Sequence, residues 1–160
     1  MKTPPNHACL HPVLLLYCYS YFQQLLKTQV QVKELGIWDS VDLIENPNDQ
    51  TLAILYKYAE ALIYPSEYEG FGLPPLEAMT MGTSVIALKT SSLPEVVGSS
   101  GILINPLQAS PGAIAEAASS LLNASAEERN NSSLKAIEQA GRFSLEKTLQ
   151  ETVAIYQQFQ

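Results

Sequence analysis

Two carboxylates flank a glycine-rich segment near the middle of the chain, and their types and spacing are those of a ligand site. Glu69 and Glu77 have seven residues between them, and residues 70–73 read Gly-Phe-Gly-Leu before two consecutive prolines. Glycine permits positive φ and leaves no side chain between backbone and ligand, so amides at a helix start can face an anion. Carboxylates accept hydrogen bonds from hydroxyl groups. The segment therefore suits a ligand that carries both a phosphate and sugar hydroxyls.

A purely structural interpretation of the same residues stands beside this one. A Gly-x-Gly pair is common in tight turns, and an exposed glutamate on a helix is usually only solvated. Spacing alone leaves both interpretations open. No metal site is predicted, because the two cysteines, Cys9 and Cys18, lack a ligand spacing and are interpreted as reduced thiols.

Short apolar runs alternate with helical patterns along the chain, and these elements must position the two acids. The expected strands are residues 13–17, 41–44, 61–64, 84–88 and 101–104. The expected helices are residues 21–35, 50–58, 74–81, 94–98, 113–122, 126–139 and 144–156, with Asn48 or Asp49 capping the second and Ser144 the last. Because the strands lack polar alternation, the pattern predicts an α/β fold, a Rossmann-like parallel sheet with flanking helices. Ligands bind such sheets beyond the carboxyl ends of the strands, where the Glu69 segment follows strand 61–64.

Composition and charge set the remaining expectations. Residues 1–12 contain three prolines and no periodicity, which predicts a disordered tail before one domain over residues 13–160. The net charge of −7, without a basic patch, argues against nucleic-acid binding. The apolar stretch of residues 13–22 is too short and polar to span a bilayer and lacks a signal cleavage site, so no transmembrane segment and a cytoplasmic location are expected.

A series of ordered motifs resembles a known family. The motifs are Tyr-Pro-Ser at 64–66, Glu-Gly-Phe-Gly-Leu-Pro at 69–74, Leu-Glu-Ala-Met at 76–79, Gly-Thr at 82–83, Val-Ile at 85–86, Ser-Ser-Leu-Pro-Glu-Val-Val-Gly at 91–98 and Asn-Pro at 105–106. Over about residues 40–156, with a weaker fit back to about residue 13, they resemble the C-terminal, donor-binding half of a group 1 (family 4) retaining glycosyltransferase of GT-B fold. Residues 143–148 fit as well, although Leu145 stands where the family usually has tryptophan.

The resemblance implies roles for the matching positions. Glu69 is the implied catalytic acid, at the transferred sugar's hydroxyls near the reacting carbon, and Glu77 is implied to bind the ribose. The segment between them is implied to line the sugar and diphosphate: Gly70, Phe71, Gly72 and Leu73. The implied reaction moves a hexose from a nucleotide-diphosphate sugar, GDP-mannose or a UDP-sugar, to a glycan or lipid acceptor in polysaccharide biosynthesis. The resemblance also implies that configuration is retained and that no metal or other cofactor is required. The sequence of residues 91–95 resembles mannosyltransferase-like members most, which hints at mannose.

The chain also departs from the family pattern. A complete enzyme of this kind has a second, N-terminal acceptor domain, so the chain is expected to be the C-terminal half alone, with a partner chain supplying the acceptor domain, or a homodimer. Peripheral membrane contact stays open. The arginine and lysine that neutralise the diphosphate in the family have no match, since Lys27 and Lys33 lie within helix 21–35. Losing two such contacts is expected to weaken donor binding on the order of 10²–10⁴-fold.

These departures leave alternatives to a transferase that is active by itself. One is a non-catalytic fragment or pseudoenzyme that keeps the fold, and another is one subunit of a two-chain transferase. A sugar-nucleotide epimerase of the same fold fits the order of the motifs poorly.

Overall fold

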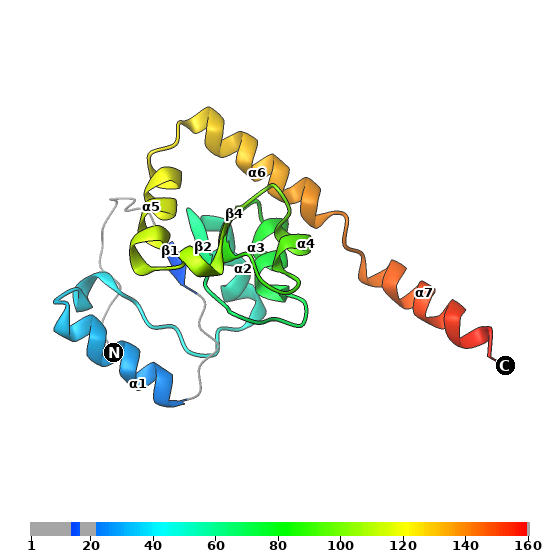
Figure 1. Ribbon diagram of the computed structural model, residues 1–160, viewed down its shortest axis with the longest axis horizontal. Coiled ribbons are helices and arrows are strands. Elements are labelled where there is room, and N and C mark those ends of the chain that lie inside the picture. Colours follow the sequence, from blue (N-terminus) through cyan, green and yellow to red (C-terminus); the bar gives the residue numbers. More distant parts are fainter. Residues whose placement is uncertain (1–13, 17–21, 160) are drawn as a thin grey trace.

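The computed structural model describes residues 14–16 and 22–159, and these form a parallel sheet flanked by helices (Figure 1). The strands are β1 (Leu14–Leu16), β2 (Ala61–Tyr64), β3 (Ser84–Leu88) and β4 (Ile102–Ile104). They lie in the order β1-β2-β3-β4, and each neighbouring pair is parallel. The predicted α/β fold with a parallel sheet is confirmed.

Every predicted helix is present, with ends within two residues of the expected ones. The helices are α1 (Phe22–Glu34), α2 (Asp49–Tyr58), α3 (Leu73–Thr80), α4 (Leu93–Val97), α5 (Pro111–Leu122), α6 (Ala126–Ala140) and α7 (Leu145–Gln157). Two short 3₁₀ helices, Trp38–Ser40 and Pro106–Gln108, join them to neighbouring segments. Asn48 is the cap of α2, because its side chain accepts from the Thr51 amide at 2.8 Å. Ser144 caps α7 as expected.

The strand predicted over residues 41–44 is wrong. These residues are irregular, although Val41 has extended backbone angles. A strand requires a neighbour that satisfies its ladder of amides and carbonyls, and β1 pairs directly with β2 while the segment pairs with neither edge of the sheet. Ile44 is accordingly 49% exposed. The N-terminal tail, Cys9 and Cys18 lie outside the described residues.

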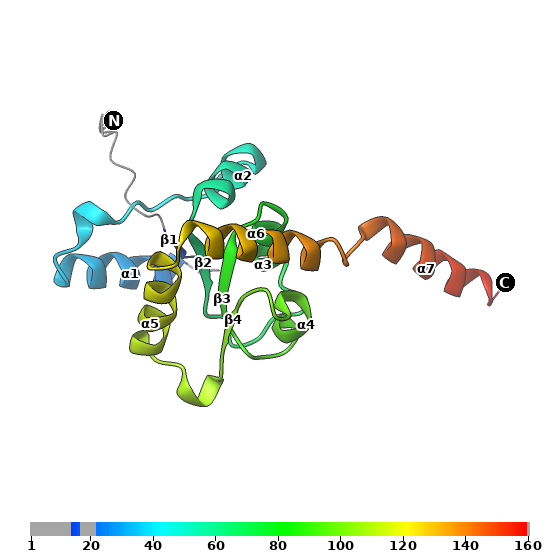
Figure 2. The same ribbon diagram turned by 90° about the horizontal axis from the view of Figure 1, so that it is seen from above.

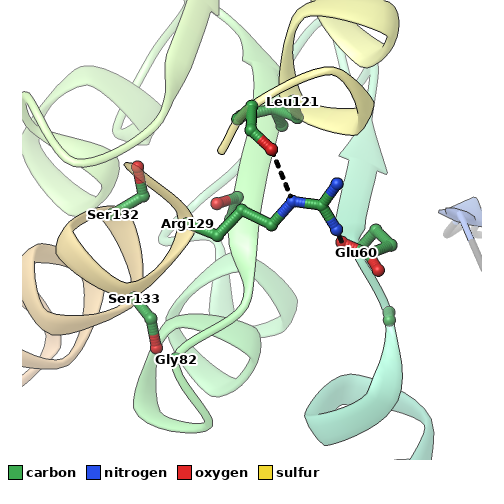
Figure 3. A pocket seen from close by; sticks show the side chains of 9 residues that line it. Glu60, Gly82, Leu121, Arg129, Ser132 and Ser133 are labelled. Atoms are coloured by element: carbon green, nitrogen blue, oxygen red, sulfur yellow. Dashed lines mark hydrogen bonds and ion pairs between the residues drawn. The ribbon is translucent and has the colours of Figure 1, made fainter. Parts of the chain in front are cut away.

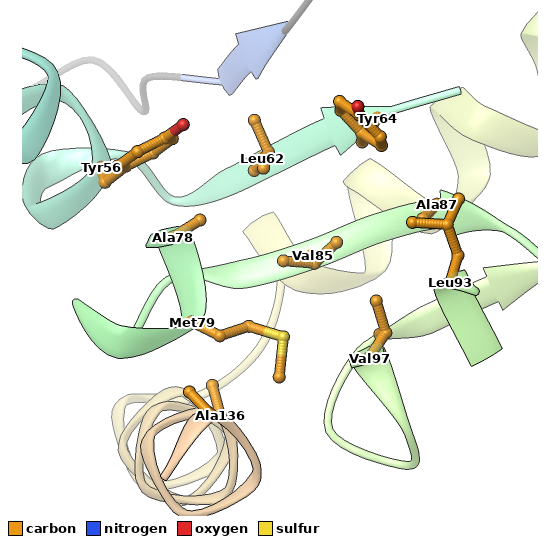
Figure 4. Close-up of a cluster of buried hydrophobic side chains, with 11 residues drawn as sticks. Tyr56, Leu62, Tyr64, Ala78, Met79, Val85, Ala87, Leu93, Val97 and Ala136 are labelled. Atoms are coloured by element: carbon orange, nitrogen blue, oxygen red, sulfur yellow. The ribbon is translucent and has the colours of Figure 1, made fainter. Parts of the chain in front are cut away.

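Two apolar layers cover the two faces of the sheet. Because side chains alternate along a strand, Leu62 and Val85 belong to one buried cluster while Ala61 and Ile86 belong to the other. Figure 4 shows the larger cluster, in which side chains from α2, α3, α4 and α6 meet those of β2 and β3. α5 supplies the smaller cluster with Ala117 and Ala118. Tyr56 is 2% exposed and belongs to the core, whereas Tyr58 is 71% exposed.

α7 extends away from the rest of the described chain, as both views of the ribbon show (Figures 1 and 2). None of its residues is buried, and apolar side chains such as Leu149 and Tyr156 are 63% and 71% exposed. A helix of 13 residues with no buried side chain is marginal in water. α7 therefore adds little to the stability of the folded body.

Removing residues 144–160 is expected to change the free energy of unfolding by less than about 0.5 kcal/mol, because the deletion takes no buried side chain with it. Urea unfolding of the two chains measures the difference. A matched deletion from residue 126 also removes α6 and its buried Ala136 and Ala140, and it is expected to abolish cooperative unfolding. Strong destabilisation by the shorter deletion would show that α7 packs on the body in solution.

Candidate functional site

The segment that carries Glu69 leaves the sheet at the carboxyl end of β2 and runs into α3. Because the strands are parallel, the connection from β3 to α4 leaves at the same end of the sheet. Side chains from that second connection reach the first: the Ser91 Oγ accepts from the Glu69 amide at 3.0 Å, and the Thr90 hydroxyl donates to the Ser66 carbonyl at 3.2 Å. The two loops therefore form one polar surface at the edge where ligands of such sheets bind.

The Glu69 carboxylate is held by two hydroxyl groups. The Tyr64 hydroxyl donates to Oε1 at 2.6 Å, and the Ser66 hydroxyl donates to the same oxygen at 2.7 Å. Tyr64 is the last residue of β2 and is 3% exposed, whereas Glu69 is half-buried. Within the described residues, the second oxygen, Oε2, accepts no hydrogen bond. The carboxylate is thus fixed at one oxygen and open at the other.

The backbone around Glu69 is fixed by two adjacent serines. The Ser92 hydroxyl lies 2.7 Å from the Phe71 carbonyl oxygen and 3.3 Å from the Glu69 carbonyl oxygen, and it donates to them. Ser91 has φ +42°, a left-handed conformation that is uncommon for a residue with a side chain. The strained residue, Ser91, is thus the one whose hydroxyl oxygen accepts the hydrogen bond from the Glu69 amide. The sequence motif at residues 91–98 included both serines, but it assigned them no role.

Residues 70–73 carry backbone donors that the protein itself does not use. In the described part of the chain, the four amides from Gly70 to Leu73 donate to no protein oxygen. α3 begins at Leu73, and Pro74 and Pro75 follow without an N–H group. The donors at this end of α3 therefore come mainly from the glycine-rich loop, and the helix dipole adds to their attraction for an anion.

The two glycines of this loop differ in what they require. Gly72 has φ +98°, and a Cβ there would lie 2.9 Å from the Leu93 Cδ2. Gly70 does not have positive φ, and a Cβ there would meet no atom within 4 Å. Gly72 is thus required by the fold, whereas Gly70 leaves open space above the loop.

Gly72→Ala is expected to lower the free energy of unfolding by about 1–3 kcal/mol, since it adds left-handed strain and a close contact with Leu93. Gly70→Ala is the matched control and is expected to change stability by less than about 0.5 kcal/mol. Urea unfolding of both variants measures the contrast. Equal stabilities would contradict the conformation assigned to Gly72.

Glu77 lies on α3 and is exposed. Its Oε2 accepts from the Tyr56 hydroxyl at 3.2 Å, and the Tyr56 carbonyl in turn accepts a short hydrogen bond from the buried Thr83 hydroxyl. Tyr56 comes from α2, so the structure connects Glu77 with α2 and not with the loop that holds Glu69. The sequence offered no signal for this contact, because 21 positions separate the two residues.

The comparisons with known proteins decide the family. The family described as "Glycosyl transferases group 1" matches residues 23–142. The chain belongs to this family. An O-antigen chain mannosyltransferase B of Escherichia coli is 52% identical over 58 residues, which are 36% of this chain and 15% of that protein. An MMP alpha-(1->4)-mannosyltransferase of Mycolicibacterium hassiacum is 46% identical over 74 residues, 46% of this chain and 18% of that protein.

A solved structure confirms the GT-B type of fold for this group 1 glycosyltransferase domain. The sucrose-phosphate synthase of Thermosynechococcus elongatus superposes with a TM-score of 0.78 at 27% identity. The match covers 91% of this chain and 38% of that protein's chain. The chain thus spans well under half the length of the relatives it matches.

An aromatic contact joins the glycine-rich loop of the glycosyltransferase domain to its last helices. The rings of Phe71 and Phe143 meet edge to face with centroids 5.7 Å apart. Phe143 lies between α6 and α7, and Phe71 is 43% exposed. The loop is therefore braced from a segment that is 72 positions away in the sequence.

Most of the described basic side chains interact away from the Glu69 loop. Arg129, Arg142 and Lys147 form ion pairs with Glu60, Glu138 and Glu151. Lys33 lies over the Trp38 ring and Lys57 over the Tyr58 ring. Lys89 is exposed, begins the connection from β3 to α4 and has no ion pair among the described residues. Sequence reasoning passed over Lys89, although its place after a strand was the available signal.

A pocket of about 170 Å³ lies at the other end of the sheet (Figure 3). It is lined near the start of β2 and β3 by Glu60 and Ser84, and from α6 by Arg129, Ser132 and Ser133. The Arg129 guanidinium is already occupied by Glu60 and by the carbonyls of Leu122 and Ala124. Neither predicted acid lines this pocket, so it is not the predicted site.

Two further findings concern metals and membranes. Among residues 14–16 and 22–159, no three His, Cys, Asp or Glu side chains converge in a way that could hold a metal ion. In that same part of the chain, none of the helices has the length and apolar character needed to cross a membrane.

Proposed function

We propose that this chain is the nucleotide-sugar-binding half of a hexosyltransferase, and that it transfers a hexose from a nucleotide-diphosphate sugar with retention of configuration. The observation that carries the proposal is the pairing of a tethered Glu69 carboxylate with four unpaired loop amides at the carboxyl edge of the sheet. Family membership supports it, as do the mannosyltransferase names of the relatives.

The proposed roles follow the charges of the reaction. Cleavage of the anomeric bond develops positive charge on the sugar and negative charge on the diphosphate. The amides of residues 70–73 are assigned to the leaving diphosphate, where preorganised donors stabilise developing charge. The Glu69 carboxylate is assigned to the sugar hydroxyls, and Glu77 to the ribose diol. No step assigned here requires a metal or another cofactor.

Mannose is the proposed sugar and GDP-mannose the proposed donor, ahead of a UDP-sugar. The support is the sequence of residues 91–95 together with the names of the two relatives, both of which are mannosyltransferases. The acceptor site is assigned to a second domain, contributed by a partner chain or by a second copy of this chain.

One observation favours a second candidate, a domain that binds nucleotide sugar without transferring it. Among the basic residues whose side chains the structure describes, Lys89 and Lys135 have no ion pair or ring contact. A diphosphate between Glu69 and Glu77 would thus meet few cations. Charge-assisted contacts to phosphate are among the stronger polar interactions, so the donor is expected to bind weakly.

Titration calorimetry with GDP-mannose, UDP-glucose and an ADP-sugar tests the proposed function. GDP-mannose is expected to bind with a dissociation constant on the order of a millimolar, with the same affinity in Mg²⁺ and in EDTA. Absence of binding by all three sugars at about ten times that concentration would refute a working donor site. Binding together with sugar transfer, once an acceptor domain is added, would exclude the binding-only candidate.

A further inference from the structure

Both hydroxyl donors of Glu69 converge on a single carboxylate oxygen. Oε1 accepts from Tyr64 at 2.6 Å and from Ser66 at 2.7 Å. The Ser66 hydroxyl also lies 3.2 Å from the Tyr68 carbonyl, but it has one proton, and the shorter contact is to the carboxylate. Two donors on one oxygen fix the plane of the carboxylate and direct the other oxygen away from them.

The Tyr64 donor is anchored more firmly than the acid it holds. Tyr64 is 3% exposed and belongs to the larger core cluster, together with Leu62 and Val85 (Figure 4). Glu69 lies on a loop and is half-buried. A phenol fixed in the core thus sets the position of a carboxylate at the surface, and the carboxylate does not have to be ordered by its ligand. Preorganisation of this kind lowers the cost of binding.

The carboxylate of the second acid, Glu77, accepts a hydrogen bond from one tyrosine hydroxyl. Glu77 Oε2 accepts from Tyr56, which is 2% exposed and lies in the same cluster. Each acid of the pair is therefore held by one core tyrosine from a different element, β2 for Glu69 and α2 for Glu77. The two tyrosines give a matched pair of isosteric substitutions, because phenylalanine removes the hydroxyl alone.

We propose that Tyr64 and Ser66 are positioning residues, which hold Glu69 Oε1 so that Oε2 faces the hydroxyls of the transferred sugar. This inference rests on the proposed function. It assigns the Tyr64–Ser66 pair to recognition of the sugar and not of the nucleotide. Tyr56 is the corresponding positioning residue for Glu77 on the nucleotide side.

The test compares GDP-mannose with GDP, which lacks the sugar and ends in a free phosphate, by calorimetry on the whole chain, and each variant is compared with the wild type for the same ligand. Tyr64→Phe and Ser66→Ala are each expected to weaken GDP-mannose roughly three- to tenfold and to change GDP less than about twofold. Ser66→Thr keeps a hydroxyl and is expected to restore most of the loss. Tyr56→Phe is expected to weaken the binding of both ligands by the same factor.

A second measurement needs no ligand. The ¹³C resonance of the Glu69 side-chain carboxyl, recorded without ligand, should shift in Tyr64→Phe and not in Tyr56→Phe.

Each outcome decides between the inference and the proposed function. Binding of GDP-mannose by the wild-type chain, with Tyr64→Phe weakening GDP and GDP-mannose equally, would overturn the positioning role and leave the proposed function intact. An unshifted Glu69 resonance in Tyr64→Phe would also overturn it, because the hydrogen bond would not exist in solution. Failure of the wild-type chain to bind GDP or GDP-mannose would refute the proposed function and with it this inference. In that case a shifted resonance would show that the hydrogen bonds serve structure alone.

Discussion

Glu77→Ala is expected to weaken the binding of GDP by about ten- to hundredfold, because the ribose diol loses a charged acceptor for its two hydroxyls. Glu77 is exposed, and among the described residues its carboxylate accepts one hydrogen bond, from Tyr56 at 3.2 Å, so removal of the carboxylate leaves the core packing in place. Titration calorimetry with GDP measures the loss, and thermal unfolding checks that the variant remains folded.

Glu69→Ala is the matched comparison for this prediction. Its carboxylate is assigned to the sugar, so GDP binding is expected to fall less than about threefold. The larger effect of Glu69→Ala should appear in the rate of sugar transfer, measured after an acceptor domain has been added. Equal losses of GDP affinity in the two variants, or a greater loss in Glu69→Ala, would contradict the assignment of Glu77 to the ribose.

Gly101→Ala is expected to lower the free energy of unfolding by about 2–3 kcal/mol. A Cβ at residue 101 would lie 2.6 Å from the Val85 carbonyl oxygen and 2.6 Å from the Val97 Cγ1. Val85 pairs with Leu62 of β2, and β3 pairs with β4 from Ile86 onward, so the Val85 carbonyl cannot move away without disturbing the sheet. Urea unfolding with linear extrapolation gives the change.

Gly112→Ala provides the control for Gly101→Ala. Gly112 lies in the first turn of α5, and a Cβ there would meet only the Ser110 Oγ, at 3.8 Å. Alanine is expected to raise stability by up to about 1 kcal/mol, since it restricts the unfolded chain and suits a helix. A stable Gly101→Ala protein would show that β4 does not approach β3 as closely as the structure describes.

The sequence predicted the helices and four of the strands well because their signals are local. Caps, prolines and glycines lie next to the helix ends they control, as Asn48, Ser125 and Ser144 do. At α6 the Ser125 amide holds the pKa of the Glu128 carboxyl below its ordinary value, with the Ser125 hydroxyl adding to the effect. The segment 41–44 failed because an apolar run becomes a strand only when a neighbour pairs with it, and the neighbour is set by the whole sheet.

By itself, the sequence predicted the family resemblance, the alternating elements and the position of Glu69 just after the carboxyl end of β2. These follow from residue types and short spacings, which the folding of the rest of the chain does not alter. Only the tertiary structure decided that Tyr64 and Ser66 share one oxygen of Glu69, that Tyr56 holds Glu77, and that Ser91 and Ser92 secure the loop. Tyr56 with Glu77, and the two serines with the Glu69 loop, meet across 20 or more positions. Hydrogen bonds depend on ångström-scale distances, which only the packing of the sheet and helices can set.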